Sequence, residues 1–348
     1  MASGADAADI KALDRAGLES LVAELGQPRF RAKQIERWLY GRGARSFDEM
    51  TDLPAGLRET LAGRLAVPSP EVVTRQDSVD GTRKYLVRFA DGVTVETVGL
   101  PTPDRLTVCF STQAGCSMAC SFCATGKAGL TRDLAPGEMV DQVRLVADDF
   151  GRRATNAVAM GQGEPFANYD ATLGALRFLN AAEDLGIGAR HITVSTCGLV
   201  SGIRRFAEEP EQFTLAVSLH SAVQATRDRL MPGVRGIDLQ VLRNTLVVYA
   251  EKTGRRPSLE YAMVDGVNDT DEELAALIRF AKHKLVHVNV IPVNPVAESG
   301  FRRSREARIR AFERGLREAG IEVSVRAERG TDIDAACGQL RQRATAGR

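Results

Sequence analysis

The alternation of apolar and polar residues divides the chain into regions of different rhythm. Residues 1–65 have helical spacing, as in LESLVAELG and AKQIERWLY, and contain no strand pattern. Residues 66–100 include TRKYLVRFADGVTVETVGL, in which apolar residues alternate on both sides of Asp91 and Gly92. Alternation about an Asp-Gly pair is typical of a β-hairpin. We therefore expect a small helical domain, followed by a hairpin that links it to the rest of the chain.

From residue 101 to residue 325, short apolar runs alternate with amphipathic stretches. The runs predict strands at LTVCFST, NAVAMGQ, HITVST, FTLAVSL, SLEYAMV, HVNVIPV and EVSVRA. The stretches predict helices at residues 136–150, 169–186, 238–254, 270–284 and 305–320. Such alternation predicts an α/β fold with a parallel sheet, open or curled into a whole or partial barrel. Active sites in these folds lie at the carboxyl ends of the strands.

The composition is typical of a soluble globular protein, with 44% hydrophobic and 26% charged residues. The chain has no apolar run of about 18 residues that could span a bilayer. Its polar start lacks the apolar segment of a secretory signal, so we expect a cytoplasmic protein. In that reducing compartment, cysteines serve as metal ligands or catalysts more often than as structural disulfides.

Positive charge gathers near the amino terminus, although the formal net charge of the whole chain is only +1. The stretch RFRAKQIERWLYGRGARSF has one acid, Glu36, against the basic residues Arg29, Arg31, Lys33, Arg37, Arg42 and Arg45. Such a patch suits contacts to nucleic-acid phosphates, and a solvated helix face is the ordinary alternative. The net charge gives no reason to expect binding to a membrane.

Three of the six cysteines lie within eight positions, in AGCSMACSFCATG, after the first predicted strand of the alternating region. Thiolates suit an iron–sulfur cluster or zinc, but structural zinc usually has four ligands in paired C-x2-C knuckles. On a cubane cluster, Cys116, Cys120 and Cys123 would leave one iron open to chelation by a small molecule. With Phe122 before the last cysteine, the loop resembles the signature of the radical S-adenosylmethionine (SAM) superfamily. The resemblance implies a 4Fe-4S cluster that cleaves SAM to a 5′-deoxyadenosyl radical.

Polar residues end several of the predicted strands, which is where a SAM pocket would lie in a strand–helix fold. In MGQGEP, the glycines permit close backbone approach, and the glutamate can accept a hydrogen bond from an amino group. Each feature alone is ordinary, because a glycine turn capped by an acid needs no ligand. The candidate SAM-binding residues are Gly163, Glu164, Ser195, Ser218, Leu219, His220 and Asn294.

Further motifs follow in order along the chain: FRAKQIERWLYGRG, MTDLP, VCFSTQAGCSMACSFCATG, MGQGEP, VSTCG, SLH, IPVNP and RGTDIDAACGQL. Together, from about residue 14 to about residue 340, they resemble the RlmN/Cfr family of RNA adenosine methyltransferases. The resemblance implies a radical SAM partial (β/α) barrel. The helical amino-terminal segment and the GEP motif make RlmN the closer relative, which implies methylation of carbon 2 of an adenosine in 23S rRNA. Carbon 8, as in Cfr, is the alternative, and tRNA stays open as a second substrate.

The same resemblance implies roles for three residues outside the cluster loop. Cys337 lies in the polar, glycine-flanked tail of residues 326–348, which we expect to be mobile, and would take a methyl group from one SAM as a thiolate nucleophile. A radical from a second SAM would activate that methyl group, because carbon 2 is electron-poor and has no acidic proton. Cys109 would then release the covalent protein–RNA complex, leaving a disulfide. Glu96, expected at an exposed strand position, would accept the ring proton.

The cycle implied by the resemblance also needs an electron donor such as flavodoxin, and a thiol reductant that reopens the disulfide. Cys197, beside Ser195, is unexpected for this family, and the sequence leaves open whether it is buried and inert or pairs wrongly with the tail. Two other readings stay open. A radical SAM enzyme with another substrate, such as an activase that makes a glycyl radical, leaves Cys337 without a role. A zinc-stabilised RNA-binding module without catalysis leaves the polar strand ends unexplained.

Overall fold

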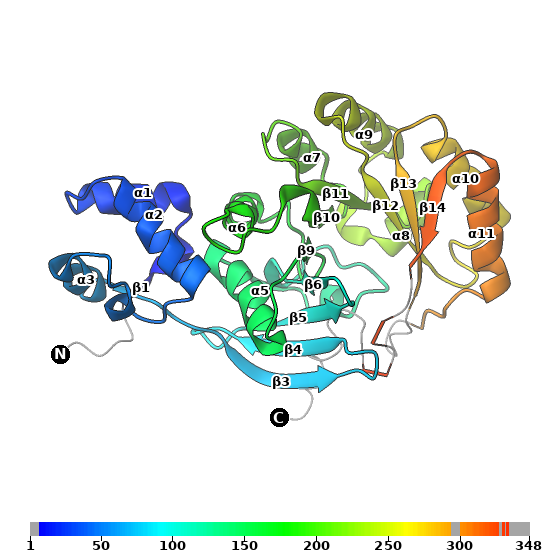
Figure 1. Cartoon of the computed structure of the whole chain (residues 1–348). Coiled ribbons are helices and arrows are strands. Elements are labelled where there is room, and N and C mark those ends of the chain that lie inside the picture. Colours follow the sequence, from blue (N-terminus) through cyan, green and yellow to red (C-terminus); the bar gives the residue numbers. More distant parts are fainter. Residues whose placement is uncertain (1–6, 294–299, 327–328, 331, 334–348) are drawn as a thin grey trace.

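The chain is described by a computed structural model, shown in Figure 1, over residues 7–293, 300–326, 329–330 and 332–333. Two of the predicted site residues, Asn294 and Cys337, lie outside the described residues. Within these ranges, every helix is too short or too polar to cross a membrane.

A ten-stranded sheet forms the centre of the structure, and seven neighbouring strands in it are parallel. In the order of both the chain and the sheet, they are β6 (Leu106–Cys109), β9 (Asn156–Ala159), β10 (Ile192–Thr196), β11 (Thr214–Ser218), β12 (Ser258–Met263), β13 (His287–Pro292) and β14 (Glu322–Val325). Each of them falls within one of the seven predicted strands. The sheet has β14 and β3 as its two edges, so it is open rather than closed into a full barrel.

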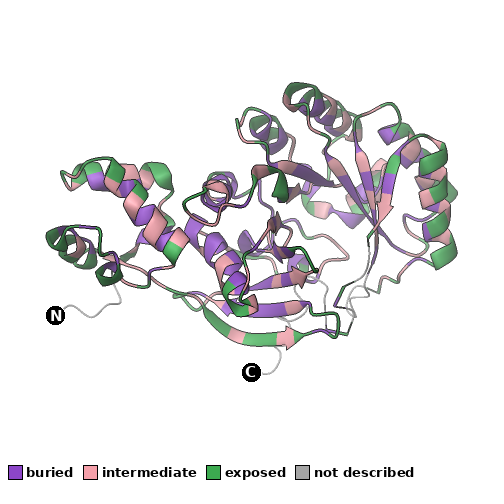
Figure 2. Cartoon of the chain, viewed as in Figure 1, coloured by how far each residue is buried: buried purple, intermediate pink, exposed green. Residues whose placement is uncertain are grey.

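Helices connect these strands: α5 (Pro136–Phe150), α6 (Tyr169–Asn180), α7 (Val200–Phe206), α8 (Gln224–Leu230), α9 (Leu239–Thr253), α10 (Asp271–Ala281) and α11 (Glu306–Glu318). The predicted helices are present as α5, α6, α9, α10 and α11, which confirms the expected α/β fold. The helices α7 and α8 were not predicted, because about two turns are too few for an amphipathic pattern to repeat. Figure 2 shows that the parallel strands are largely buried, while the outer side of α11 is exposed.

Two predicted helices end earlier than the sequence pattern indicates. The helix α6 ends at Asn180 because Ala181 has extended backbone, with ψ of 128°. In the same way α10 ends at Ala281, since the next residue, Lys282, has ψ of 136°. Extended backbone at the position after a helix prevents the next intrahelical hydrogen bond, so the apolar pattern beyond it belongs to the following loop.

The predicted hairpin is present and continues the parallel sheet. Its strands β4 (Arg83–Arg88) and β5 (Thr94–Pro101) pair antiparallel, and β5 pairs antiparallel with β6. A third antiparallel strand, β3 (Glu71–Asp77), forms the outer edge and was not predicted, because most of its side chains face solvent on both sides. The strand β5 is therefore an interior strand of a ten-stranded sheet, and not one arm of a solvated two-stranded hairpin.

The amino-terminal region is helical, with α1 (Arg15–Glu24), α2 (Phe30–Glu36), a π-helical turn η2 (Arg37–Arg42) and α3 (Ala55–Ala62). Ile35 and Leu39 are fully buried, and Trp38 packs against the same core, as their shared helix face predicts. The region also contains a parallel pair of two-residue strands, β1 (Ala8–Asp9) and β2 (Leu65–Ala66), although no strand was predicted there. Two residues are too few to produce an alternating pattern.

A buried ion pair joins this region to the helix α5. The Lys11 ammonium donates to both carboxylate oxygens of Asp141, at 2.9 and 2.8 Å. Burial raises the pKa of Asp141 to about 6, while the Lys11 charge acts in the opposite direction. Removing either partner would leave an uncompensated charge in the interior, so the pair holds the first segment of the chain to the central fold.

Candidate active site

A cavity of about 660 Å³ lies at the carboxyl ends of the parallel strands. It brings together most of the predicted site residues, which come from five separate parts of the chain. Those that line it are Cys109, Cys116, Cys120, Cys123, Gly163, Glu164, Ser195, Ser218 and His220. The expectation that polar groups at strand ends share one space is therefore met for these residues.

The loop that carries the three cysteines is closed at its base by a small antiparallel ribbon. This ribbon pairs β7 (Gln113–Gly115) with β8 (Leu130–Asp133), and the Cys116 N–H donates to the Gly129 carbonyl at 2.9 Å. Gly115 has φ of +82°, and a β-carbon there would lie 2.0 Å from the Gly129 oxygen. Only glycine fits this crossing. A short helix, α4 (Ala124–Lys127), begins directly after the last cysteine.

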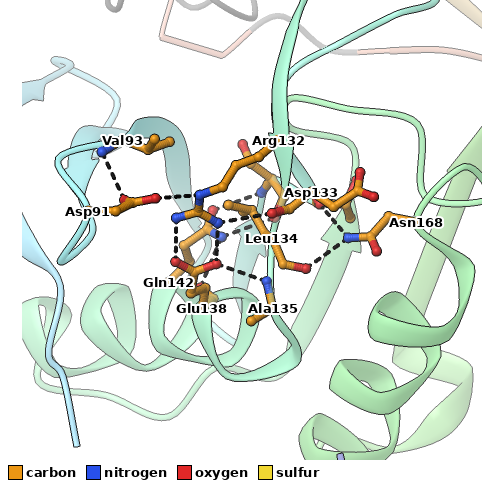
Figure 3. Close-up of polar contacts among 11 residues, drawn as sticks. Asp91, Val93, Arg132, Asp133, Leu134, Ala135, Glu138, Gln142 and Asn168 are labelled. Atoms are coloured by element: carbon orange, nitrogen blue, oxygen red, sulfur yellow. Dashed lines mark hydrogen bonds and ion pairs between the residues drawn. The ribbon is translucent and has the colours of Figure 1, made fainter. Parts of the chain in front are cut away.

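Figure 3 shows how this base is fixed to the rest of the molecule by Arg132. Its guanidinium donates to both carboxylate oxygens of Glu138 on α5, at 2.8 and 2.7 Å, and to Asp91 in the β4–β5 turn, at 2.5 Å. Glu138 also accepts the Ala135 N–H at 2.8 Å, so the same carboxylate caps the start of α5 and holds the ribbon. Two-pronged arginine–carboxylate contacts are directional, and they fix the position of the loop relative to the sheet.

The opposite side of the loop is held by the end of α8 and the turn η5 (Pro232–Val234). The Ser121 N–H donates to the Leu230 carbonyl at 2.8 Å, and the Gly233 N–H donates to the Met118 carbonyl at 2.9 Å. A β-carbon at Gly233 would lie 2.5 Å from the Met118 α-carbon, so the two backbones approach closely. Hydrogen bonds from other parts of the chain therefore hold the loop on two sides.

The sulfur atoms of the loop lie in an apolar environment. Burial raises the pKa of Cys116 to about 12 and also raises the pKa of Cys123. The pKa of Cys120 is lowered instead, because the Cys197 thiol donates a hydrogen bond to it. Cys197 lines the cavity beside the loop and is a free cysteine. Among the described residues, no group of three His, Cys, Asp or Glu side chains could hold a single metal ion.

At the end of β9, the MGQGEP segment forms a close-packed turn. Gly163 has φ of +105°, and a β-carbon there would lie 2.7 Å from the Gln113 nitrogen. The Glu164 carboxylate is 1% exposed and accepts the N–H groups of Phe166 at 2.9 Å and Cys197 at 2.6 Å. Burial raises the pKa of Glu164. Glu164 lines the cavity, so a ligand amino group could donate to this carboxylate there.

His220, at the end of β11, is held as a neutral ring. Burial lowers its pKa to about 3, and the nearby charge of Arg227 acts in the same direction. Its Nδ1 accepts the Ala262 N–H at 3.0 Å, so the ring proton is on Nε2. The ring meets Phe122 of the cluster loop edge to face, at 4.8 Å between centroids. Leu219 is fully buried and is not among the cavity-lining residues, so the structure does not bring it to the cavity with the other predicted residues.

The predicted catalytic residues Cys109 and Glu96 differ in their position relative to the cavity. Cys109 ends β6 and lines the cavity, and burial raises its pKa to about 11. Glu96 was expected to be exposed, but it is 4% exposed and its Oε1 lies 3.5 Å from the Lys84 ammonium. The expectation was wrong because β5 is an interior strand of the sheet. Glu96 is also not among the residues that line the cavity, although its charge acts on Cys109.

The basic segment near the amino terminus is partly neutralised by acids that are distant in sequence. Arg29 pairs with Glu19, and Arg37 pairs with Asp52. Glu36, the one acid within the segment, is buried and pairs with Arg15 instead. The tertiary structure therefore leaves less free positive charge than the sequence count indicates.

Several cavity residues were missed by the sequence reasoning. Glu260, in the middle of β12, is 5% exposed and accepts from the Ser258 hydroxyl at 2.8 Å and from the Asn289 amide at 2.9 Å. Its place as a charged residue inside the apolar run SLEYAMV was a signal from which a site role for Glu260 could have been predicted. Arg326 and Arg329, which follow β14, also line the cavity. They belong to the polar tail, where no pattern distinguishes one arginine from another.

Two protein-family models match the chain. Residues 8–67 match the Ribosomal RNA large subunit methyltransferase N-terminal domain, and residues 110–281 match the Radical SAM superfamily. A protein of Pelotomaculum thermopropionicum, named "Probable dual-specificity RNA methyltransferase RlmN", is 46% identical over 340 residues, which are 97% of this chain and 92% of that protein. The chain belongs to the RlmN family. The resemblance inferred from the motifs is thereby confirmed.

Other RlmN relatives agree with this assignment. A protein of Gloeobacter violaceus with the same name is 48% identical over 94% of this chain and 93% of its own length. The crystal structure of a radical SAM methyltransferase from Sphaerobacter thermophilus is 47% identical and superposes with a TM-score of 0.87. It covers 95% of this chain, and this chain covers 98% of it.

Membership of the radical SAM superfamily implies a 4Fe-4S cluster and SAM. The residues of this RlmN chain fit both groups, because three soft sulfur ligands on one bonded loop face the same cavity as the glycine and carboxylate of the β9 turn. The match to the Radical SAM superfamily argues against the reading as a zinc-stabilised RNA-binding module without catalysis.

Proposed function

We propose that this protein is a radical SAM methyltransferase that methylates carbon 2 of a specific adenosine in 23S rRNA, and of an adenosine in tRNA. The observation that carries the proposal is the shared cavity, in which the three loop thiols, Cys109 and the polar strand ends meet. The names of the relatives, which call them dual-specificity RNA methyltransferases, support RNA as the substrate.

In this proposal Cys116, Cys120 and Cys123 hold the cluster, which, when bound, supplies the electron that cleaves SAM to a 5′-deoxyadenosyl radical. The SAM contacts are assigned to the residues predicted for that role. They are Gly163, Glu164, Ser195, Ser218, Leu219, His220 and Asn294. The neutral His220 can donate through Nε2, and the Glu164 carboxylate can accept from an amino group.

Cys337 is proposed as the methyl carrier and Cys109 as the resolving thiol. With its pKa raised to about 11, Cys109 is mostly protonated at neutral pH and must lose its proton before it attacks the Cys337 sulfur. The positive charges of Arg326 and Lys84 act on Cys109 and favour the thiolate. Glu96 is proposed to take the ring proton, and its ion pair with Lys84 gives the carboxylate a fixed position.

The described residues before Cys337 support its reach into the cavity. Asp332 accepts from the Ser78 hydroxyl at 2.5 Å and from the Val79 N–H at 2.9 Å, which ties the chain to the turn between β3 and β4. Arg329, three residues earlier, lines the cavity. Cys337 is five positions after Asp332, so the carrier lies at most about 18 Å of extended chain from that anchor.

Anaerobic incubation with SAM, an electron donor and the RNA tests the proposal. We expect mass spectrometry to find a methyl group on the sulfur of the Cys337 peptide, and 2-methyladenosine in the digested RNA. Formation of 8-methyladenosine would instead support the carbon-8 alternative. Absence of both the methylated peptide and a methylated base, from protein with a full cluster, would contradict the proposed function.

The basic segment is proposed to contact RNA phosphates. We expect the triple variant R29A/R31A/K33A to bind RNA at least about tenfold more weakly at low salt, and the slope of log affinity against log salt to decrease by roughly one unit per lost contact. The triple variant also loses the ion pair between Arg29 and Glu19. That loss does not by itself change the salt slope, because the pair forms within the protein and not with RNA.

Filter binding at several salt concentrations measures both quantities. The matched control R310A/R314A/R317A removes three arginines from α11, at the opposite end of the molecule in Figure 1, and should change the slope much less. An unchanged affinity and slope in R29A/R31A/K33A would remove the basic segment from the RNA-binding surface.

A further inference from the structure

Arg227, on the short helix α8, is a fully buried arginine with unused hydrogen-bond donors. Its side chain is among the largest that are completely covered, at 0% exposure. Its Nη2 donates to the Cys197 carbonyl at 2.6 Å, but Nε and Nη1 have no partner within the described part of the chain. No ion pair among the described residues includes Arg227. The Asp228 carboxylate acts on Arg227 without forming an ion pair with it. A buried charge without an ion-pair partner is costly, so its retention calls for a further negative group that it stabilises.

The surroundings of Arg227 point to the loop that carries the three cysteines. Ser121, within that loop, is bonded at its N–H and its hydroxyl to the carbonyls of Leu230 and Arg229, both close to Arg227 in sequence. Cys197, whose carbonyl Arg227 holds, lines the same cavity as Cys120. The helix α8 therefore presents its one buried charge directly behind the cluster loop.

The Cys197 peptide is also fixed from its other side. Its N–H donates to the Glu164 carboxylate at 2.6 Å, while its carbonyl accepts from Arg227 at 2.6 Å. A β-carbon at the next residue, Gly198, would lie 3.0 Å from Nη2 of Arg227, so the contact is close. Arg227 and the carboxylate proposed to receive the SAM amino group thus hold the same peptide, and the charge of Arg227 acts on Cys120 of the loop.

We propose that Arg227 is a positioning residue that offsets the negative charge of the thiolate-bound cluster and raises its reduction potential. Three thiolates give the cluster a net negative charge, and one-electron reduction adds a further negative charge. A fixed positive charge in a dry environment stabilises the reduced state more than the oxidised state. The inference rests on the proposed function only in requiring that a 4Fe-4S cluster is bound.

The test compares R227Q and R227K with wild type after anaerobic cluster reconstitution. Iron per chain is measured first, and the midpoint potential of the bound cluster is then determined by redox titration followed by electron paramagnetic resonance. We expect a more negative potential in R227Q, because the charge is lost, and a potential near wild type in R227K, because the charge is kept. The matched control R229Q removes an exposed arginine from the same helix and should leave the potential unchanged.

The other outcomes are also decisive. An R227Q cluster with the wild-type potential would overturn the proposal, and so would an R227K shift as large as that of R227Q, since only geometry would then matter. Loss of the cluster from both variants would overturn it as well, because Arg227 would then be a requirement for the structure of the loop. A wild-type protein that binds no 4Fe-4S cluster would contradict the proposed function itself.

Discussion

Replacing Cys337 by alanine is expected to abolish RNA methylation while leaving the cluster and SAM cleavage intact. The proposed reaction transfers the methyl group through the Cys337 sulfur, so its removal leaves the radical with no methyl group to activate. Removal of a covalent nucleophile commonly lowers turnover by several orders of magnitude, and we expect a loss of at least about 10³-fold in C337A. The measurement is the yield of 2-methyladenosine after anaerobic incubation with SAM.

The same C337A samples supply the control. Iron content should equal that of wild type, because the three proposed cluster ligands lie in a loop bonded by the β7–β8 ribbon and by α8. Cleavage of SAM to 5′-deoxyadenosine should continue, since it needs the cluster and the SAM pocket alone. Methylation in C337A at a rate near wild type would remove the covalent carrier from the mechanism and favour a radical SAM enzyme of another kind.

Replacing Cys109 by alanine is expected to trap a covalent protein–RNA complex. In the proposed cycle the Cys109 thiolate attacks the Cys337 sulfur and so releases the methylated base. Without that thiol the complex should accumulate to roughly one per chain, while free 2-methyladenosine falls at least about 10²-fold. A nuclease-sensitive band of reduced mobility on a denaturing gel measures the complex.

A variant from the same strand and the same cavity separates loss of the thiol from damage to the cavity. Thr107→Ala also changes a cavity-lining side chain of β6 and should release product normally. In wild type, release should accelerate as the pH rises from about 7 to about 9, because burial raises the Cys109 pKa to about 11 and the thiolate fraction grows throughout that range. Normal turnover by C109A would assign resolution to another thiol.

Most of the central fold could be predicted from sequence, because its elements are long or strongly patterned. All seven parallel strands lie within predicted apolar runs, and α5 has the predicted bounds of residues 136–150. The elements that were missed lack such a pattern. The strand β3 is exposed on both faces, and α7 and α8 are seven residues each. The missed helix α8 contains Arg227, so the position of this buried charge was not predicted.

The candidate site was predictable where one local rule applies, namely that polar groups at the carboxyl ends of parallel strands converge. The rule correctly predicts that Ser195, Ser218 and His220 line one cavity with the cysteine loop. It could not find Glu260, which lies within a strand and not at its end. Nor could it give the protonation of His220, which depends on burial and on the Ala262 N–H from a neighbouring strand.

The sequence by itself determined the strand–helix order, the place of the three-cysteine loop and the family, because these depend on periodicity and motif spacing along the chain. Only the tertiary structure decided the environment of individual charges. Glu96 is buried because β5 has a strand on each side, and Arg29 is paired because α1 brings Glu19 beside it. Burial and electrostatic pairing depend on which distant segments pack together, and no local pattern encodes that.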